Sequence, residues 1–84
     1  MNMKNTQINS SNYLTKDLGE ASALIVKGVN LIRLEKESNF YWFVFQGSGI
    51  NEISNDYWSG KLQTSAKKYY DQMRSLKDRL FAQR

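Results

Sequence analysis

The stretch FYWFVF, residues 40–45, constrains the fold more than any other part of the sequence. If these residues form a strand, Phe40, Trp42 and Val44 point to one face and residues 41, 43 and 45 point to the other. A strand with bulky apolar side chains on both faces is typical of a sheet centre or of a sheet covered on both sides. We therefore predict that this strand is central or covered on both faces.

The residues before it predict a partner strand. In VNLIRLEKE, residues 29, 31, 33 and 35 would share one face, and residues 32, 34 and 36 would share the other. Ser38 and Asn39 separate the two stretches and supply a turn. Residues 29–46 are thus predicted to form a hairpin, which makes antiparallel pairing the firmest feature of the topology.

A helix is predicted upstream of the hairpin. Asp17 is a suitable N-cap, and Glu20, three residues later, completes a capping-box pattern. Gly28 stands where a left-handed residue ends a helix, with Val29 following to pack back. The apolar residues between these signals recur at helical spacing: Leu18, Ala21, Leu24 and Ile25.

The rest of the chain completes a β-α-β-β-α-α order. NYLTK, residues 12–16, is a possible short strand whose pairing the sequence leaves open. A short helix is expected from Ile50 to near Gly60, and a last helix follows Thr64 or Ser65 as N-cap. We predict a single small α+β domain over residues 13–84, with helices covering a hairpin-centred antiparallel sheet. Residues 1–12 are expected to be a flexible polar leader.

Composition narrows the possible functions. The 84 residues include no cysteine and no histidine, so disulfides, ordinary zinc sites and histidine-based catalysis are absent. The first twelve residues lack the apolar core of a signal peptide, and no apolar run is long enough to span a membrane. We expect a non-enzymatic cytoplasmic protein that uses no cofactor, no metal and no membrane partner.

The net charge of +4 is unevenly distributed. Residues 1–60 carry five Lys/Arg and six Asp/Glu, whereas residues 61–84 carry seven and two, a local net charge of +5. Such a basic end attracts nucleic acid, acidic membranes or acidic proteins, although a solvated terminal helix has the same composition.

The last helix carries two neighbouring rows of side chains. The first row is apolar and should face the core: Tyr69, Met73, Leu76 and Leu80. The second row combines aromatic and cationic residues and lies within about 60° on a helical wheel: Tyr70, Arg74, Lys77 and Phe81. We call this second row the edge row. Lys77 lies nearest the core stripe, and Arg74 lies farthest from it.

Three interpretations of the edge row stay open. In the first, the cations extend their stems over apolar surface and pair with Asp17, Glu20 or Asp78. Alternatively, the row binds nucleic acid, DNA or RNA, or it contacts a protein. The leading hypothesis is nucleic-acid binding, with phosphate contacts from Lys67, Lys68, Arg74 and Lys77 and stacking on Tyr70. The alternative is a protein-interaction module or homodimer, with Tyr57, Trp58 and Phe81 as interface residues.

Other motifs have simpler explanations. QGSGIN, residues 46–51, precedes a helix but lacks the third glycine of a dinucleotide loop and the Gly-Lys-Ser/Thr of a triphosphate loop. The segment from Gly47 to Gly49 is therefore expected to be a plain turn. The carboxylate pairs Asp17 with Glu20 and Glu52 with Asp56 are explained by helix capping and the helix dipole.

Several segments together resemble an uncharacterised family, a domain of unknown function in short bacterial and phage proteins. They are YLTKDLGEASALIVKG, WFVF, YWSGKLQ and RSLKDRLF, which span residues 13–81. The resemblance implies a compact domain of helices and strands, often encoded by mobile elements. It implies no activity, but it includes Arg74 and Lys77 in its last segment.

Overall fold

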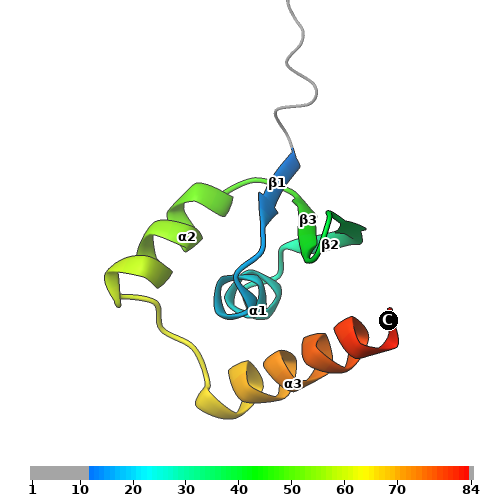
Figure 1. Cartoon of the computed structure of the whole chain (residues 1–84). Coiled ribbons are helices and arrows are strands. Elements are labelled where there is room, and N and C mark those ends of the chain that lie inside the picture. The colour runs from blue at the N-terminus through cyan, green and yellow to red at the C-terminus, as the bar shows by residue number, and fades with distance from the viewer. Residues whose placement is uncertain (1–11, 84) are drawn as a thin grey trace, which may run out of the picture.

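The computed structural model describes residues 12–83, and the predicted leader falls mostly on residues 1–11, which lie outside this range. The elements are β1 (Asn12–Thr15), α1 (Leu18–Val26), β2 (Asn30–Lys36), β3 (Tyr41–Gln46), α2 (Ile50–Ser59) and α3 (Ala66–Ala82), shown in Figure 1. This is the predicted β-α-β-β-α-α order, and the α+β class is confirmed.

Strand β3 lies at the centre of a three-stranded antiparallel sheet with the order β1-β3-β2. The prediction of a central strand is therefore confirmed. The sequence left the place of β1 open, and the structure pairs it with β3, with Tyr13 opposite Phe45 and Thr15 opposite Phe43.

One face of the sheet forms the core. Phe43 and Phe45 lie on this face and are almost fully buried. Their partners on β2 are Leu34 and Leu31, respectively, and the register shifts between Leu31 and Arg33. Strict alternation along β2 was therefore a wrong prediction. The bulge brings Leu31 and Leu34 to the same face, and both pack against the core.

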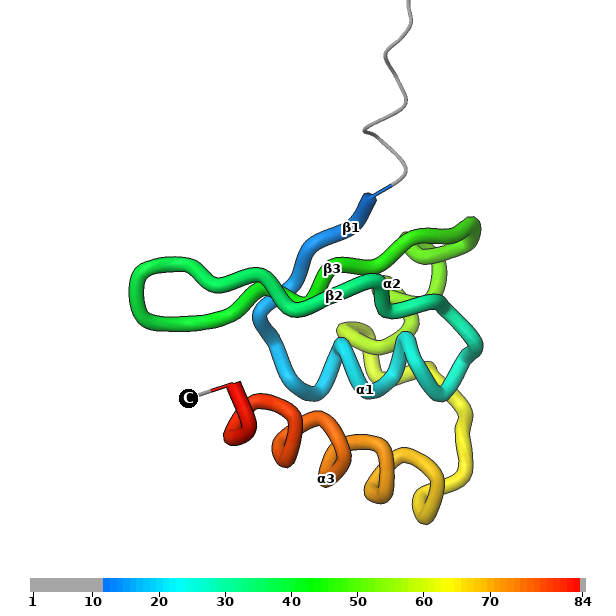
Figure 2. Tube along the Cα trace, turned by 90° about the vertical axis from the view of Figure 1, so that its right-hand side faces the viewer, coloured from blue at the N-terminus to red at the C-terminus, as the bar shows by residue number. Residues whose placement is uncertain are grey.

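Helix α1 is the centre of the molecule. Figure 2 shows the sheet, α1 and α3 as successive layers, and Figure 1 shows α2 beside them. The residues Ala21, Ser22, Ala23 and Leu24 are fully buried, because small side chains let neighbouring elements approach α1 closely. At its C-terminus, the Val29 N–H donates to Leu24 O at 2.9 Å and the Gly28 N–H to Ile25 O at 2.9 Å. With φ of 93° at Gly28, this is the predicted glycine termination.

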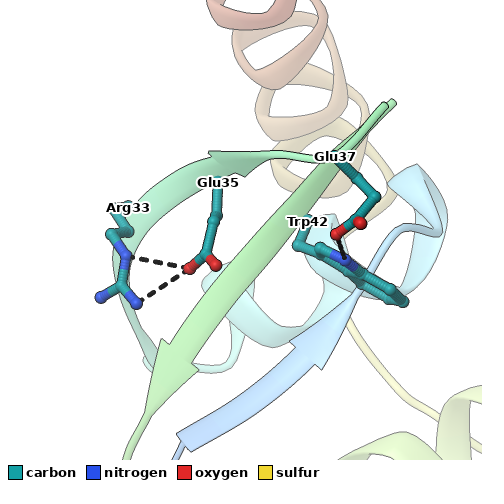
Figure 3. Close-up of polar contacts among 4 residues, drawn as sticks. All are labelled: Arg33, Glu35, Glu37 and Trp42. Atoms are coloured by element: carbon teal, nitrogen blue, oxygen red, sulfur yellow. Dashed lines mark hydrogen bonds and ion pairs between the residues drawn. The ribbon is translucent and has the colours of Figure 1, made fainter. Parts of the chain in front are cut away.

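The opposite face of the sheet carries two polar contacts together with apolar residues. Arg33 donates to Glu35 at 2.9 Å, and the Trp42 indole N–H donates to Glu37 at 3.1 Å, as Figure 3 shows. Val44 lies on this face opposite Leu14 and Arg33 and is fully buried, whereas Leu14 is 44% exposed. This face therefore remains partly apolar.

Candidate nucleic-acid interface

The two predicted rows of side chains on helix α3 differ in burial, as expected. Ser65 is the N-cap, and its hydroxyl accepts a hydrogen bond from the Lys68 N–H at 3.2 Å. Leu76 is buried in the core, and Tyr69, Met73 and Leu80 are half-buried. The four edge-row residues are all exposed, with Tyr70 57% and Phe81 62% accessible.

The first half of the edge row is a stacked pair. The Arg74 guanidinium lies 5.8 Å from the centroid of the Tyr70 ring, which is within cation–π distance. Among the residues that the structure describes, the ion pairs are Arg33–Glu35 and Lys67–Asp71, so Arg74 and Lys77 do not pair with Asp17, Glu20 or Asp78.

The two lysines at the start of α3 lie on different sides of the helix. Lys67 forms a 2.9 Å ion pair with Asp71, four residues later, although both side chains are largely exposed. Lys68 is also exposed and lies about 20° from Arg79 on the helical wheel, on the other side of the core stripe from Arg74. The structure therefore brings Tyr70, Arg74, Lys77 and Phe81 together. Lys67 lies about 20° from Arg74 on the wheel and continues this side of the helix by one turn, whereas Lys68 does not.

The second half of the edge row borders a groove of about 460 Å³. The groove lies between the end of the β2–β3 hairpin and the C-terminal half of α3, which lie on the same side of the molecule in Figure 2. The hydroxyl of Tyr41 links these walls by donating to Gln83 O at 3.3 Å. The lining residues come from three segments of the chain: Lys16, Leu18, Asn39, Phe40, Tyr41, Phe43, Lys77, Leu80 and Phe81.

Lys16 is a groove residue that sequence reasoning missed. Its ammonium lies 4.7 Å from the centroid of the Phe40 ring, and with Lys77 it gives the groove two cations. None of the described residues that line the groove is acidic. The spacing along the chain gives no signal for this site, because Lys16 and Phe40 meet α3 only through the tertiary fold.

The predicted protein-interface residues do not form one surface. Trp58 is 60% exposed near the end of α2, whereas Phe81 lies near the far end of α3, about 22 Å from the start of that helix. Tyr57 is half-buried between the helices. A Cβ at Gly19 would lie 2.1 Å from the Tyr57 hydroxyl oxygen, so α1 needs glycine at this position.

Burial also affects the ionisation of Tyr57. Loss of solvation, together with a hydrogen bond to Tyr69, raises the pKa of Tyr57 to about 12. Tyr69 in turn donates to the backbone carbonyl of Gly19 at 3.3 Å. These two tyrosines hold α2 and α3 against the start of α1.

The role of Glu20 differs from the prediction. Asp17 accepts the Glu20 N–H at 2.7 Å, which confirms Asp17 as N-cap. The Glu20 carboxylate was predicted to complete a capping box, but the N–H of Asp17 donates to Thr15 instead. That part of the prediction is wrong, because the carboxylate turns into the protein, where only 3% of the residue is exposed.

The buried carboxylate is surrounded by hydroxyl groups. Thr15 and Ser54 each donate to it at 2.7 Å, and Tyr13 donates at 2.5 Å. Burial raises the pKa of Glu20, but the hydrogen bonds from Ser54, Tyr13, Thr15 and Trp58 outweigh this effect and leave the pKa below its usual value. The network connects β1, α1 and α2, and the hydroxyl donors favour the ionised form.

The glycine segment after β3 forms a turn. Gly49 is the N-cap of α2 with φ of 74°, and no side chain caps the helix. Because β3 pairs antiparallel with both neighbours, the strand–loop–helix segment lacks the parallel crossover that a nucleotide-binding loop requires. The structure thus supports the expectation of a plain turn.

The fold and the edge row define a small α+β domain with a basic terminal helix. The chain belongs to the family described as domain of unknown function DUF5659, whose model matches residues 10–82. The match confirms the resemblance to an uncharacterised family. No curated protein and no solved structure was found to match the chain.

Two further features concern possible ligands and membranes. Within residues 12–83, no three metal-ligating side chains are grouped closely enough to hold a metal ion. Over the same residues, no helix combines the length and the apolar character needed to cross a membrane.

Proposed function

We propose that this domain is a non-enzymatic binding module that binds nucleic acid through the edge row of α3. The observation that carries the proposal is an exposed, contiguous row in which two cations, Arg74 and Lys77, lie between two aromatic rings, Tyr70 and Phe81. Sequence-tolerant nucleic-acid binding uses two components: cations contact phosphates, and aromatic rings stack on bases.

The charges around the edge row support this proposal. Arg74 and Lys77 form no ion pair within the described residues, so phosphate contacts would displace only water and counterions. Lys67 shares its charge with Asp71, but an exposed pair of this kind contributes only about 0–1 kcal/mol. Lys67 can therefore exchange its carboxylate for a phosphate, whereas Lys68 lies on the Arg79 side of the helix, away from the edge row.

The test is a fluorescence-anisotropy titration of labelled single- and double-stranded DNA and RNA at low salt. The Arg74→Gln/Lys77→Gln variant should lose at least tenfold in affinity, since it removes two phosphate contacts. Arg79→Gln is the matched control, because Arg79 is exposed on the same helix but on the other side of the core stripe. Absence of binding by the wild-type protein, or equal losses in both variants, would contradict the proposal.

A second candidate is protein binding, as an accessory or inhibitor protein of a mobile element or as a homodimer. It is favoured by exposed apolar side chains outside α3, namely Leu14, Ile32 and Trp58. Sedimentation velocity over a wide range of protein concentrations tests the homodimer. Leu14→Lys should abolish any concentration-dependent association while leaving the circular dichroism spectrum unchanged.

A further inference from the structure

We infer that the groove beside α3 receives one unstacked base of a single-stranded nucleic acid, with Lys16 and Lys77 contacting the flanking phosphates. This inference rests on the proposed nucleic-acid function and specifies the form of the ligand. The groove meets the edge row at Lys77 and Phe81, which belong to both.

The shape and lining of the groove suit a flat aromatic ligand. Its volume of about 460 Å³ lies within the range of small-molecule sites. Phe43 forms a buried floor, whereas Phe40 and Tyr41 are half-buried and Phe81 is 62% exposed, so rings are present on more than one wall. Asn39 adds a side-chain amide that can both donate to and accept from a base edge.

The charge of the groove indicates an anionic ligand. Lys16 comes from the β1–α1 connection and Lys77 from α3, so the two cations reach the groove from different walls. With no acidic residue among the described lining, nothing in the groove opposes an anion. A nucleotide unit combines the required parts, because its planar base is bonded to a backbone that carries a phosphate on each side.

Continuity with α3 extends the binding path. The edge row runs from Phe81 back to Tyr70, a length of about 16 Å along the helix axis. A strand with one base in the groove would pass Lys77 and then reach the stacked Tyr70–Arg74 pair. A duplex would first have to unpair and flip a base at a cost of a few kcal/mol, so single strands should bind more tightly.

The experiment compares three labelled ligands of equal length, about twelve nucleotides, by anisotropy: a single strand, a duplex, and a single strand whose central positions are abasic. The abasic strand keeps every phosphate but lacks the central bases. We expect the wild-type protein to bind the normal strand about five- to a hundredfold more tightly than the abasic strand, since stacking is lost. Phe81→Ala should reduce this preference, and Lys16→Gln should weaken the binding of both strands by losing a phosphate contact. Lys61→Gln, an exposed lysine outside the groove, should change neither the preference nor the affinity.

The outcomes separate this inference from the proposed function. Equal binding of normal and abasic strands, with affinity still lost in Arg74→Gln/Lys77→Gln, would overturn the groove assignment and leave the α3 surface intact. No binding of any strand would overturn both. A labelled acidic peptide with an aromatic side chain gives the third outcome. If its binding depends on Lys16 and Phe81 and oligonucleotides do not displace it, the groove is a protein-binding site and the inference is overturned.

Discussion

The hydroxyl of Ser54, on α2, donates a 2.7 Å hydrogen bond to the buried carboxylate of Glu20, on α1. The two residues are 34 positions apart in the chain, and Tyr13 and Thr15 of β1 donate to the same carboxylate. This network fixes the first strand and the second helix to the first turn of α1. It thereby stabilises the framework that carries α3.

Replacing the carboxylate should destabilise the fold without removing the side chain's bulk. Glu20→Gln puts an amide NH₂ group among hydroxyl donors, so we expect a loss of about 1–3 kcal/mol in the free energy of unfolding. Urea denaturation followed by tryptophan fluorescence measures this. Glu52→Gln, in the exposed first turn of α2, should cost at most about 1 kcal/mol. Equal losses in the two variants would contradict the role of Glu20.

The same network predicts a dependence of stability on acid pH. The folded-state pKa of Glu20 lies below its unfolded value, so the unfolded chain binds more protons as the pH falls. The contribution of Glu20 is therefore present above the unfolded pKa and is lost as pH falls through the folded pKa. Between about pH 6 and about pH 3, the wild-type protein should lose more stability than Glu20→Gln. Parallel pH profiles of the two proteins would contradict this.

These cases show what the sequence could predict. Signals that act within a few residues were read correctly: Asp17 and Ser65 cap helices, and Gly28 ends one. Residues 40–45 identified the central strand because they place bulky side chains on both faces, and such a strand is usually central or covered on both sides. The Glu20 carboxylate was predicted from a local motif, the capping box, but in the structure it accepts hydrogen bonds from β1 and α2.

One part of the candidate site, the edge row, was predictable from the sequence, and the other part, the groove, was not. The edge row could be predicted because residues on one helix keep their angular relation wherever the helix packs. The groove could not, since Lys16, Phe40 and Lys77 come from separate segments and meet only after the hairpin, β1 and α3 have packed. The bulge after Leu31 also escaped prediction, because it depends on pairing with Phe45 and Val44.

Close packing at Gly19 predicts a coupled pair of substitutions. Gly19→Ala places a Cβ 2.1 Å from the Tyr57 hydroxyl oxygen, and overpacking of about 1–3 kcal/mol should exceed any helical gain. In the Tyr57→Phe background the same change should cost distinctly less, because the obstructing oxygen is gone. A double-mutant cycle of unfolding free energies measures the coupling, and additive effects would show that Tyr57 does not restrict this position.

The raised pKa of Tyr57 predicts instability at alkaline pH. Its folded pKa of about 12 lies above the ordinary tyrosine pKa of about 10, so its contribution is fully present below about pH 10. That contribution is lost as the pH rises toward the folded value. Tyr57→Phe should therefore lose less stability than the wild-type protein over this interval, as followed by thermal unfolding. A steeper loss in Tyr57→Phe would contradict the assignment.

The salt dependence of oligonucleotide binding tests the central claim most directly. The logarithm of the binding constant, plotted against the logarithm of salt concentration, has a slope of about −0.7 for each phosphate neutralised on a single strand. For Arg74→Gln/Lys77→Gln we predict a slope that is shallower than the wild-type slope by about 1.4, and for Arg79→Gln an unchanged slope. Binding that does not respond to salt, or slopes that are identical in all three proteins, would contradict nucleic-acid recognition by the edge row.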